Sequence, residues 1–386
     1  MKTMLLMIVL IVLVTGSAMA TPLDYDEINQ QLFDKLSPDQ INQFIVKINQ
    51  ELNEDIPLLS TGTIKDIASK GITADWNALW QTVINRFLKE VAANTHLMGK
   101  LLFLAVLCVL LQNLQNSFEQ SGISVLAYSV CFIFLSVIAL TAFYNAISLA
   151  RDTVDHMVSF MEALLPLLIS LLAGVGALTS AALFTPLMLF VVSTVSVIIK
   201  NIVLPLLLIT SVLDCVNYLS EKYRLSNLTS LFKQSGMMIL GFTLVVFIGI
   251  VTVQGVAGGV ADGVTLRTAK YATTTFVPVV GKMFADTVEL VMGASLLLKN
   301  AVGIFGVLVV LTICAFPLIK LLSLVAIMKV TGALIQPMGD DRMGKCLDSM
   351  GNNLLLVFGA LLTVVLMFFL AITMIIGAGS AAMMLR

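Results

Sequence analysis

The residues of this sequence that could carry chemistry are charged side chains placed within or beside long apolar runs. A charge at the centre of a lipid bilayer costs at least ~2.5 kcal/mol, so a buried one implies a partner or a water-filled cavity. Near the end of a span, a lysine instead extends its ammonium to the interface at little cost, and this structural role competes with a functional one. The charges in question are Lys200, Asp214, Asp286, Glu289, Lys299, Lys320 and Lys329.

Familiar catalytic and metal-binding patterns are missing from the sequence. It contains no phosphate-binding loop of the form G-x-x-x-x-G-K-[ST], no H-E-x-x-H and no G-x-S-x-G. The two histidines, His96 and His156, are far apart, and the five cysteines include no C-x-x-C pattern, so we expect no zinc site. The sequence therefore predicts a protein that is not an enzyme and has no catalytic residue, metal or cofactor.

The composition is that of a membrane protein. Of the 386 residues, 59% are hydrophobic and only 12% are charged, whereas an ordinary globular domain has about 25% charged residues. Too few charges remain after the first hundred residues to cover a water-exposed surface, so we expect the lipid bilayer to cover it. The net charge is -1 and no basic cluster with interleaved aromatics occurs, which argues against nucleic acid as a partner.

Residues 1–20 have the pattern of a secretory signal peptide. Lys2 is followed by an apolar run and then by the small-residue triplet Ala18-Met19-Ala20, so we expect cleavage after Ala20. The alternative is an uncleaved first span, but the apolar run is shorter than the roughly 20 residues that cross a bilayer. In either case, the segment that follows is exported.

Residues 21–95 are predicted to form a small helical domain outside the cytoplasm. Up to residue 94 the segment has eleven Asp or Glu residues against six Lys or Arg residues. A first helix is expected from Ser37, where Ser, Pro and Gln have the spacing of a helix start. A second amphipathic helix begins near Asp75 and contains both tryptophans, Trp76 and Trp80. These two side chains belong either to an interfacial aromatic belt or to the core of the small domain.

Residues 96–386 are predicted to form a polytopic transmembrane domain, so the expected fold class is all-α. Several apolar segments are shorter than about 20 residues and contain Gly or Pro, so some are expected to be re-entrant. We expect six to nine crossings, with amphipathic connectors at 148–162 and 219–236 lying along the membrane surface. Lys and Arg do not settle the sidedness of the later loops. The apolar segments are 98–114, 122–146, 163–179, 181–199, 202–218, 237–258, 301–319, 321–337 and 353–378.

A strip of glycines marks a predicted helix-packing face. Gly255, Gly259 and Gly263 stand at i, i+4 and i+8, so a helix would place them on one side, where another helix can approach closely. The helix that packs there belongs either to the same bundle or to a partner subunit.

Polar residues directly after this strip predict a different kind of segment. Arg267 and Lys270 lie among small and hydroxyl side chains, and Pro278 and Gly281 follow. That mixture favours an irregular, water-lined segment or a docking loop across 254–286. The candidates for a polar pathway or a docking site are therefore Lys200, Asp214, Arg267, Lys270 and Lys299.

Several polar or glycine-rich motifs resemble one known family. The chain is similar to the stage III sporulation AE family of endospore-forming bacteria over nearly its whole mature length, most weakly before residue 96. The motifs are LLQNLQNSF (110–118), QGVAGGVADGVTLRTAKYATTTFVPVVGKMFAD (254–286), LLLKNAVGIFG (296–306), AFPLIKLLSL (315–324), IQPMGDDRMGKCLD (335–348) and FFLAIT (368–373).

The resemblance implies a role in a complex that links two cells. A member of this family is expected in the mother-cell membrane around the forespore. Its expected partners are the other stage III sporulation A-operon proteins, which include a motor ATPase and ring-forming subunits, and the stage II protein Q of the forespore. There it would serve as a permease-like or platform subunit of a channel or secretion apparatus, and the family offers no catalytic residues to carry over.

A stand-alone secondary transporter of a small metabolite is the alternative function. Such a protein would place Lys200, Asp214 and Lys299 near one site at the membrane midplane. Uptake into proteoliposomes by the chain alone would favour this alternative, whereas dependence on partners would favour the complex.

Overall fold

The computed structural model describes residues 76–117, 122–219, 225–276, 280–338 and 341–384, and these are almost entirely helical with no β-strand among them. The predicted all-α class is therefore confirmed. The second amphipathic helix expected near Asp75 is present from Trp76. The expected signal peptide, 1–20, and the helix expected from Ser37 lie outside the described residues.

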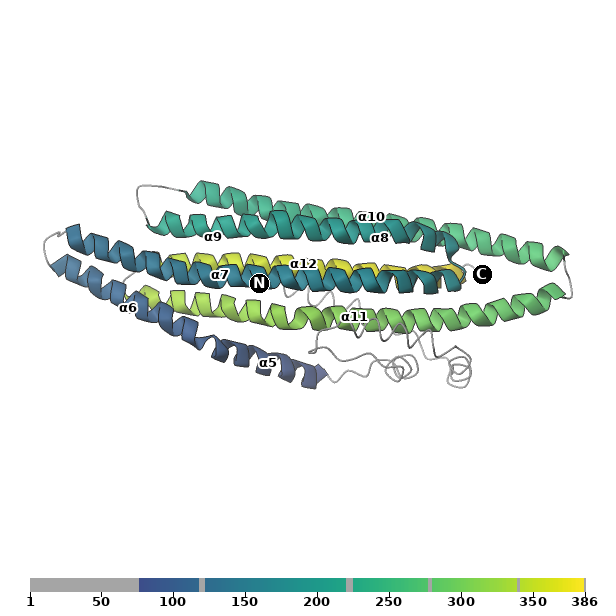
Figure 1. Ribbon diagram of the computed structural model, residues 1–386, viewed down its shortest axis with the longest axis horizontal. Helices are drawn as coiled ribbons and strands as arrows, with labels where there is room; N and C mark the ends of the chain where they lie inside the picture. The colour runs from purple at the N-terminus through teal and green to yellow at the C-terminus, as the bar shows by residue number, and fades with distance from the viewer. Residues whose placement is uncertain (1–75, 118–121, 220–224, 277–279, 339–340, 385–386) are drawn as a thin grey trace.

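The helices run along one long axis as a bundle of extended rods (Figure 1). The α-helices are α5 (Trp76–Ala93), α6 (Thr95–Ser117), α7 (Gly122–Gly174), α8 (Leu178–Ile198), α9 (Leu204–Leu219), α10 (Ser226–Phe276), α11 (Val280–Ile335) and α12 (Asp341–Met384). A π-helical turn, η1 (Ile199–Val203), joins α8 to α9, and a short 3-10 helix, η2 (Gln336–Met338), follows α11.

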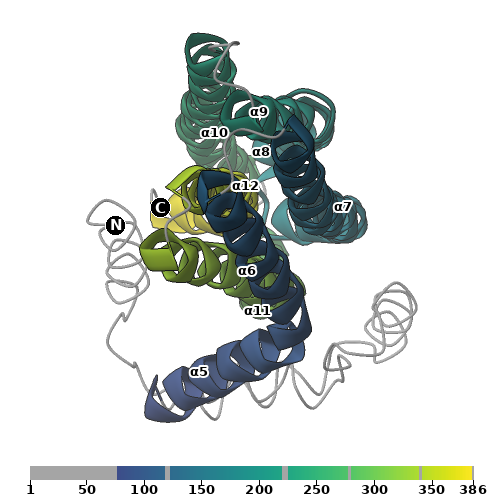
Figure 2. The ribbon, with the colours of Figure 1, turned by 90° about the vertical axis from the view of Figure 1, so that its left-hand side faces the viewer.

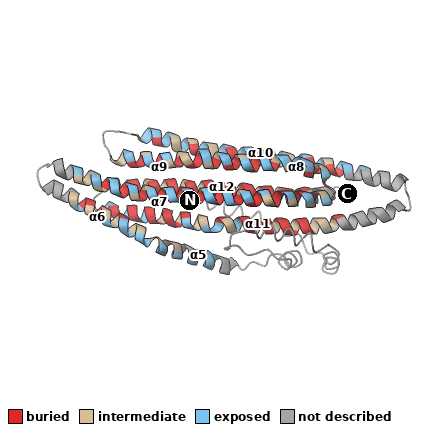
Figure 3. Ribbon diagram, in the orientation of Figure 1, coloured by how far each residue is buried: buried red, intermediate tan, exposed pale blue. Residues whose placement is uncertain are grey.

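Helix α12 forms the centre of the bundle. It packs against α7, α8, α9, α10 and α11, and the end-on view shows it surrounded by other helices (Figure 2). In the most apolar stretch of α12, 56% of the residues are buried, whereas in the corresponding stretch of α10 only 22% are buried. Colouring by burial accordingly shows α10 exposed along its outer face (Figure 3). We infer that α10 is mainly a lipid-facing helix and that α12 is the core around which the others pack.

The connector expected along the membrane surface at 148–162 is instead the middle of α7. The predicted segment 122–146 and most of the segment 163–179 merge into one helix of 53 residues that ends at Gly174, and the last residues of 163–179 lead into α8. No Gly or Pro occurs between 148 and 162, and the charged side chains there all lie on the exposed face. Polar residues on one face do not end a helix, whereas a break would leave backbone groups unpaired in apolar surroundings.

Other predicted breaks are also absent. Segments 181–199 and 202–218 continue into each other through η1, and segments 301–319 and 321–337 merge in α11, which contains Pro317. Five described helices are long and apolar enough to cross a membrane. A sixth is added if α5 and α6, which meet at a 45° bend, count as one span. These helices indicate a multi-pass membrane protein, and the upper count of six among the described residues equals the lower end of the six to nine crossings expected.

The prediction of an irregular segment across 254–286 is also wrong, because the described backbone there is helical. Helix α10 continues to Phe276 and α11 begins at Val280, so helix occupies all of this stretch except 277–279, which lie outside the described residues. The hydroxyl and glycine residues that suggested irregular chain are each compatible with a helix whose neighbours pack closely.

The candidate spans are long in comparison with a membrane. They contain 38 to 49 residues, which at 1.5 Å per residue corresponds to about 57–74 Å. The hydrocarbon core of a bilayer is about 30 Å thick. Each of these helices is therefore longer than one bilayer core is thick.

A pair of glycines brings the backbones of α11 and α12 into direct contact. A Cβ atom added to Gly332 would lie 2.8 Å from the carbonyl oxygen of Gly344, and one added to Gly344 would lie 3.0 Å from the carbonyl oxygen of Gly332. These distances involve rigid backbone atoms, so neither helix can give way by rotating a side chain.

Replacing Gly332 with alanine should therefore destabilise the bundle by about 1–3 kcal/mol, because the added methyl group forces two backbones apart. Thermal unfolding of the purified chain in detergent would measure this. The matched control is Gly359→Ala on α12, where an added Cβ meets nothing within 4 Å. The control should be neutral or stabilising by up to about 1 kcal/mol through helix propensity. Equal melting temperatures for the two variants would contradict the close approach.

Candidate functional site

Lys200 lies in η1 and forms an ion pair with Asp155 of α7. The Lys200 side chain is 24% exposed and that of Asp155 is 52% exposed. The pair therefore lies on the outside of the bundle, at mid-length of α7, and is not a buried unpaired charge. An ion pair with this exposure contributes about 0–1 kcal/mol.

Asp214 is buried between α9 and α12 at the centre of a polar cluster. Its Oδ2 accepts hydrogen bonds from Ser349 Oγ at 2.6 Å and from Asn353 Nδ2 at 2.8 Å. Asn353 Nδ2 also donates to Ser211 Oγ at 3.1 Å. Within the part of the chain that the structure describes, no lysine or arginine forms an ion pair with Asp214. The carboxylate is thus held by neutral donors.

Three sulfur atoms adjoin the Asp214 cluster. The Sγ atom of Cys215 lies 3.7 Å from Met350 Sδ and 3.7 Å from Cys346 Sγ, and all three side chains are buried. Both cysteines are free thiols. The three sulfurs therefore pack against one another as small, weakly polar groups inside the α9–α12 interface.

Lys299 is fully buried on α11, where its Nζ donates to the carbonyl oxygen of Ile376 on α12 at 2.8 Å. Its contact on α12 is 23 residues beyond Asn353, a separation of about 35 Å along the helix. Lys299 and Asp214 are therefore at different levels of the bundle, and Lys200 lies on its outside. The structure does not bring these three residues together into one site.

A buried carboxylate that the sequence reasoning missed is Asp262 on α10. It is only 1% exposed, and it accepts hydrogen bonds from the backbone N–H of Thr179 at 2.8 Å and of Ser180 at 3.1 and 3.3 Å. These are among the first amides of α8, whose own N-cap residue, Ala177, provides no side-chain acceptor. Asp262 therefore caps a helix that begins 84 residues earlier in the chain, and its charge is also favoured by the positive end of the helix dipole.

Two signals in the sequence could have identified Asp262. It lies between two of the strip glycines, within the most distinctive stretch of the chain. In addition, the segment that starts at Leu178 is preceded by Gly-Ala, with no Ser, Asp or Asn to cap it locally. A helix start without a local cap requires an acceptor from elsewhere.

The glycine strip of α10 faces other helices of the same chain. A Cβ atom added to Gly255 would lie 3.0 Å from Met374 Cε of α12, and Gly259 and Gly263 are buried. Gly255 and Gly259 also line a groove of about 300 Å³ against Met374 and Gly377. For Arg267 and Lys270, the backbone is helical within α10, but their side chains lie outside what the structure describes.

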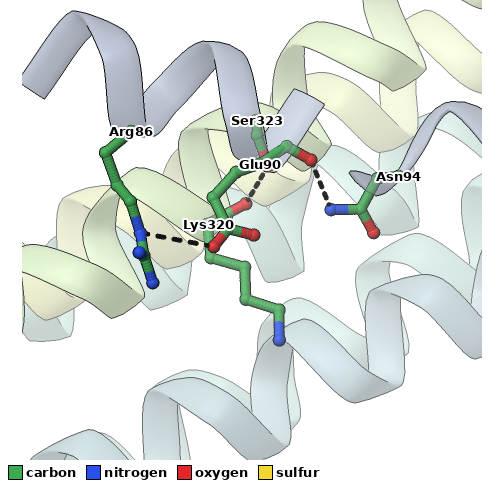
Figure 4. A network of polar contacts seen from close by, with 5 residues as sticks. All are labelled: Arg86, Glu90, Asn94, Lys320 and Ser323. Atoms are coloured by element: carbon green, nitrogen blue, oxygen red, sulfur yellow. Dashed lines mark hydrogen bonds and ion pairs between the residues drawn. The ribbon is translucent and has the colours of Figure 1, made fainter. Parts of the chain in front are cut away.

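The bend between α5 and α6 forms a second polar region, where α5 docks on α11 (Figure 4). Arg86 pairs with Glu90 at 3.7 Å and its guanidinium lies 4.4 Å from the centre of the Phe316 ring. Asn94 Nδ2 donates to the carbonyl oxygen of Glu90 at 2.8 Å. Beside this contact is a cavity of about 500 Å³ whose polar lining residues are Asn94, His96, Lys100, Thr141, Asn145 and Lys320.

Comparison with known proteins identifies the family. The model of the family described as stage III sporulation protein AE matches residues 60–379. The chain belongs to the stage III sporulation protein AE family. Stage III sporulation protein AE of Bacillus subtilis (strain 168) is 39% identical over 380 residues, which cover 97% of this chain and 95% of that protein. No solved structure matches the chain. The resemblance noted in the sequence is therefore confirmed, and the chain is a sporulation protein with membrane helices.

Removing the carboxylate of Asp262 should destabilise this member of the stage III sporulation protein AE family. In Asp262→Ala the first amides of α8 lose their acceptor, and the loss of such a cap costs about 1–2 kcal/mol. Thermal unfolding of the purified chain measures the change. Asp155→Ala is the matched control, because it removes an exposed carboxylate with an expected cost of about 0–1 kcal/mol. A loss no greater than that of the control would show that α8 does not depend on this cap.

Proposed function

We propose that this protein is a non-enzymatic membrane subunit of the sporulation channel that links mother cell and forespore. It resides in the mother-cell membrane around the forespore and has a permease-like or platform role. Its proposed partners are the other stage III sporulation A-operon proteins, including the motor ATPase and the ring-forming subunits, and the stage II protein Q of the forespore. Membership of the stage III sporulation protein AE family supports the link to sporulation.

A charged stripe on α7 is the observation that carries the proposal of a subunit. The α7 stripe consists of Arg151, Asp152, Asp155, His156 and Glu162, all exposed on one side of the helix. The first half of α7 exposes apolar side chains, as lipid contact requires: Leu126, Val130, Ile133, Phe134 and Val137. Lipid does not solvate charges at low cost, so the stripe needs water or another protein against it. A subunit of a larger assembly meets this need, because its partners cover a surface that the single chain leaves open.

The stand-alone transporter is less well supported. It requires Lys200, Asp214 and Lys299 to share one site, whereas these residues have separate partners: Asp155 on α7, Ser349 and Asn353 on α12, and the carbonyl of Ile376. Asp214 and Lys299 thus lie at different levels of the bundle, and Lys200 lies on its outside.

Exchanging the charges of the α7 stripe tests the role as a subunit. In the double variant Arg151→Asp, Asp152→Arg the net charge is unchanged, but like charges would face any partner that complements the native order. We expect normal abundance in the membrane together with loss of co-purifying operon proteins and a sharp fall in spore yield. Pull-down from sporulating cells and counts of heat-resistant spores measure the two effects.

The control for this experiment exchanges another exposed pair, Asp341→Lys with Lys345→Asp, which keeps its i,i+4 pairing on α12. This control should sporulate normally. Unchanged assembly and spore yield in the α7 variant would refute the partner contact. Substrate uptake into proteoliposomes by the chain alone would favour the transporter instead.

A reporter fusion tests the proposed location of residues 21–95. A phosphatase that is active only outside the cytoplasm, fused after Asn94, should be active, because a signal peptide precedes the segment. A cytoplasm-specific reporter at the same position is the control and should be inactive. The reverse result would place this segment in the cytoplasm and overturn the proposed topology.

A further inference from the structure

The Asp214 cluster contains a buried negative charge that the described hydrogen bonds hold but do not neutralise. The carboxylate is 8% exposed, and both of its donors, Ser349 and Asn353, are neutral. In apolar surroundings an ionised carboxylate is costly unless a cation or a proton balances it. Both donors bind the same oxygen, Oδ2, and the other carboxylate oxygen is not among the described buried atoms that lack a partner, so it lies on the partly exposed side of the group.

Asn353 provides the second and independent observation. Its side chain is fully buried, and its Oδ1 atom has no hydrogen-bond partner, although buried acceptors are nearly always paired. The amide nitrogen of the same group contacts Asp214 and Ser211. A half-turn of the amide plane would therefore exchange the two atoms and direct Oδ1 toward the carboxylate.

We propose that Asp214, Asn353, Ser211 and Ser349 form a binding site for an alkali-metal cation, Na⁺ or K⁺. In the bound state the Asn353 amide turns so that Oδ1 faces the ion. The ligands are then one carboxylate, one amide oxygen and two hydroxyl oxygens, contributed by α9 and α12. The site goes beyond the proposed function and does not depend on any partner of the chain.

The chemistry of the donors selects this class of ion. All four are hard oxygen donors, which suit alkali and alkaline-earth cations better than the softer transition metals. Only one of them is charged, and no group of three His, Cys, Asp or Glu side chains that could hold a metal occurs among the described residues. Divalent cations are normally held by more carboxylate charge than this, so a monovalent cation fits best.

A ligand that binds only the folded state raises the melting temperature with its concentration, and this gives the test. The full chain, purified in detergent, is unfolded in NaCl or KCl up to about 150 mM, with choline chloride holding the ionic strength constant. We expect the melting temperature to rise by about 2 °C or more and to saturate. The rise should disappear in Asp214→Asn.

Two further variants keep the test interpretable. Asp348→Asn changes an exposed carboxylate next to Ser349 that pairs with Lys329, and it should retain the full response. If Asp214→Asn fails to fold, Ser349→Ala removes one ligand and should require a higher salt concentration for the same rise. Identical melting temperatures of the wild-type chain in NaCl, KCl and choline chloride would overturn the proposal. So would a full response in Asp214→Asn, or a rise that only divalent cations produce.

Discussion

The desolvation of charge constrains how this bundle can pack. A carboxylate or an ammonium away from water needs hydrogen bonds from its neighbours, and helices satisfy their own backbone groups, so these bonds come from other helices. Asp214 finds its donors on α12, Asp262 finds them at the start of α8, and Lys299 finds its acceptor on α12. Apolar faces rich in leucine and valine fit together in several registers. Each buried charge permits only one of these registers, because a shift by one helical turn would leave that charge without its hydrogen-bond partner.

The helical class and the positions of the apolar segments could be predicted from the sequence, but the continuity of the helices could not. A hydropathy pattern records where charges occur, whereas a helix ends only where backbone hydrogen bonds are lost or caps replace them. Residues 148–162 contain charges without a helix breaker, so α7 continues through them. Pro317 removes one backbone donor from α11, and neighbouring helices hold the chain straight enough for the helix to proceed.

The polar site could be predicted in part. Asp214 and Lys299 were identified because charges within apolar runs are costly, and both are buried. Lys200 met the same criterion but lies at the surface beside Asp155, because the sequence does not reveal which face of a helix is covered. Asp262 was not predicted because a missing cap at the start of α8 does not say where in the chain the acceptor lies, and here it is 83 residues away from Thr179.

The cap supplied by Asp262 also has a consequence for biogenesis. Chains are made from the N-terminus, so the hairpin of α7 and α8, with its left-handed glycine at Gly176, is synthesised before α10. Until residue 262 emerges, the first amides of α8 have no carboxylate and must be hydrated. Water therefore leaves this end of the hairpin only when α10 packs over it. The packing of α10 is then a late step of membrane insertion, and an early hairpin is completed only by a later helix.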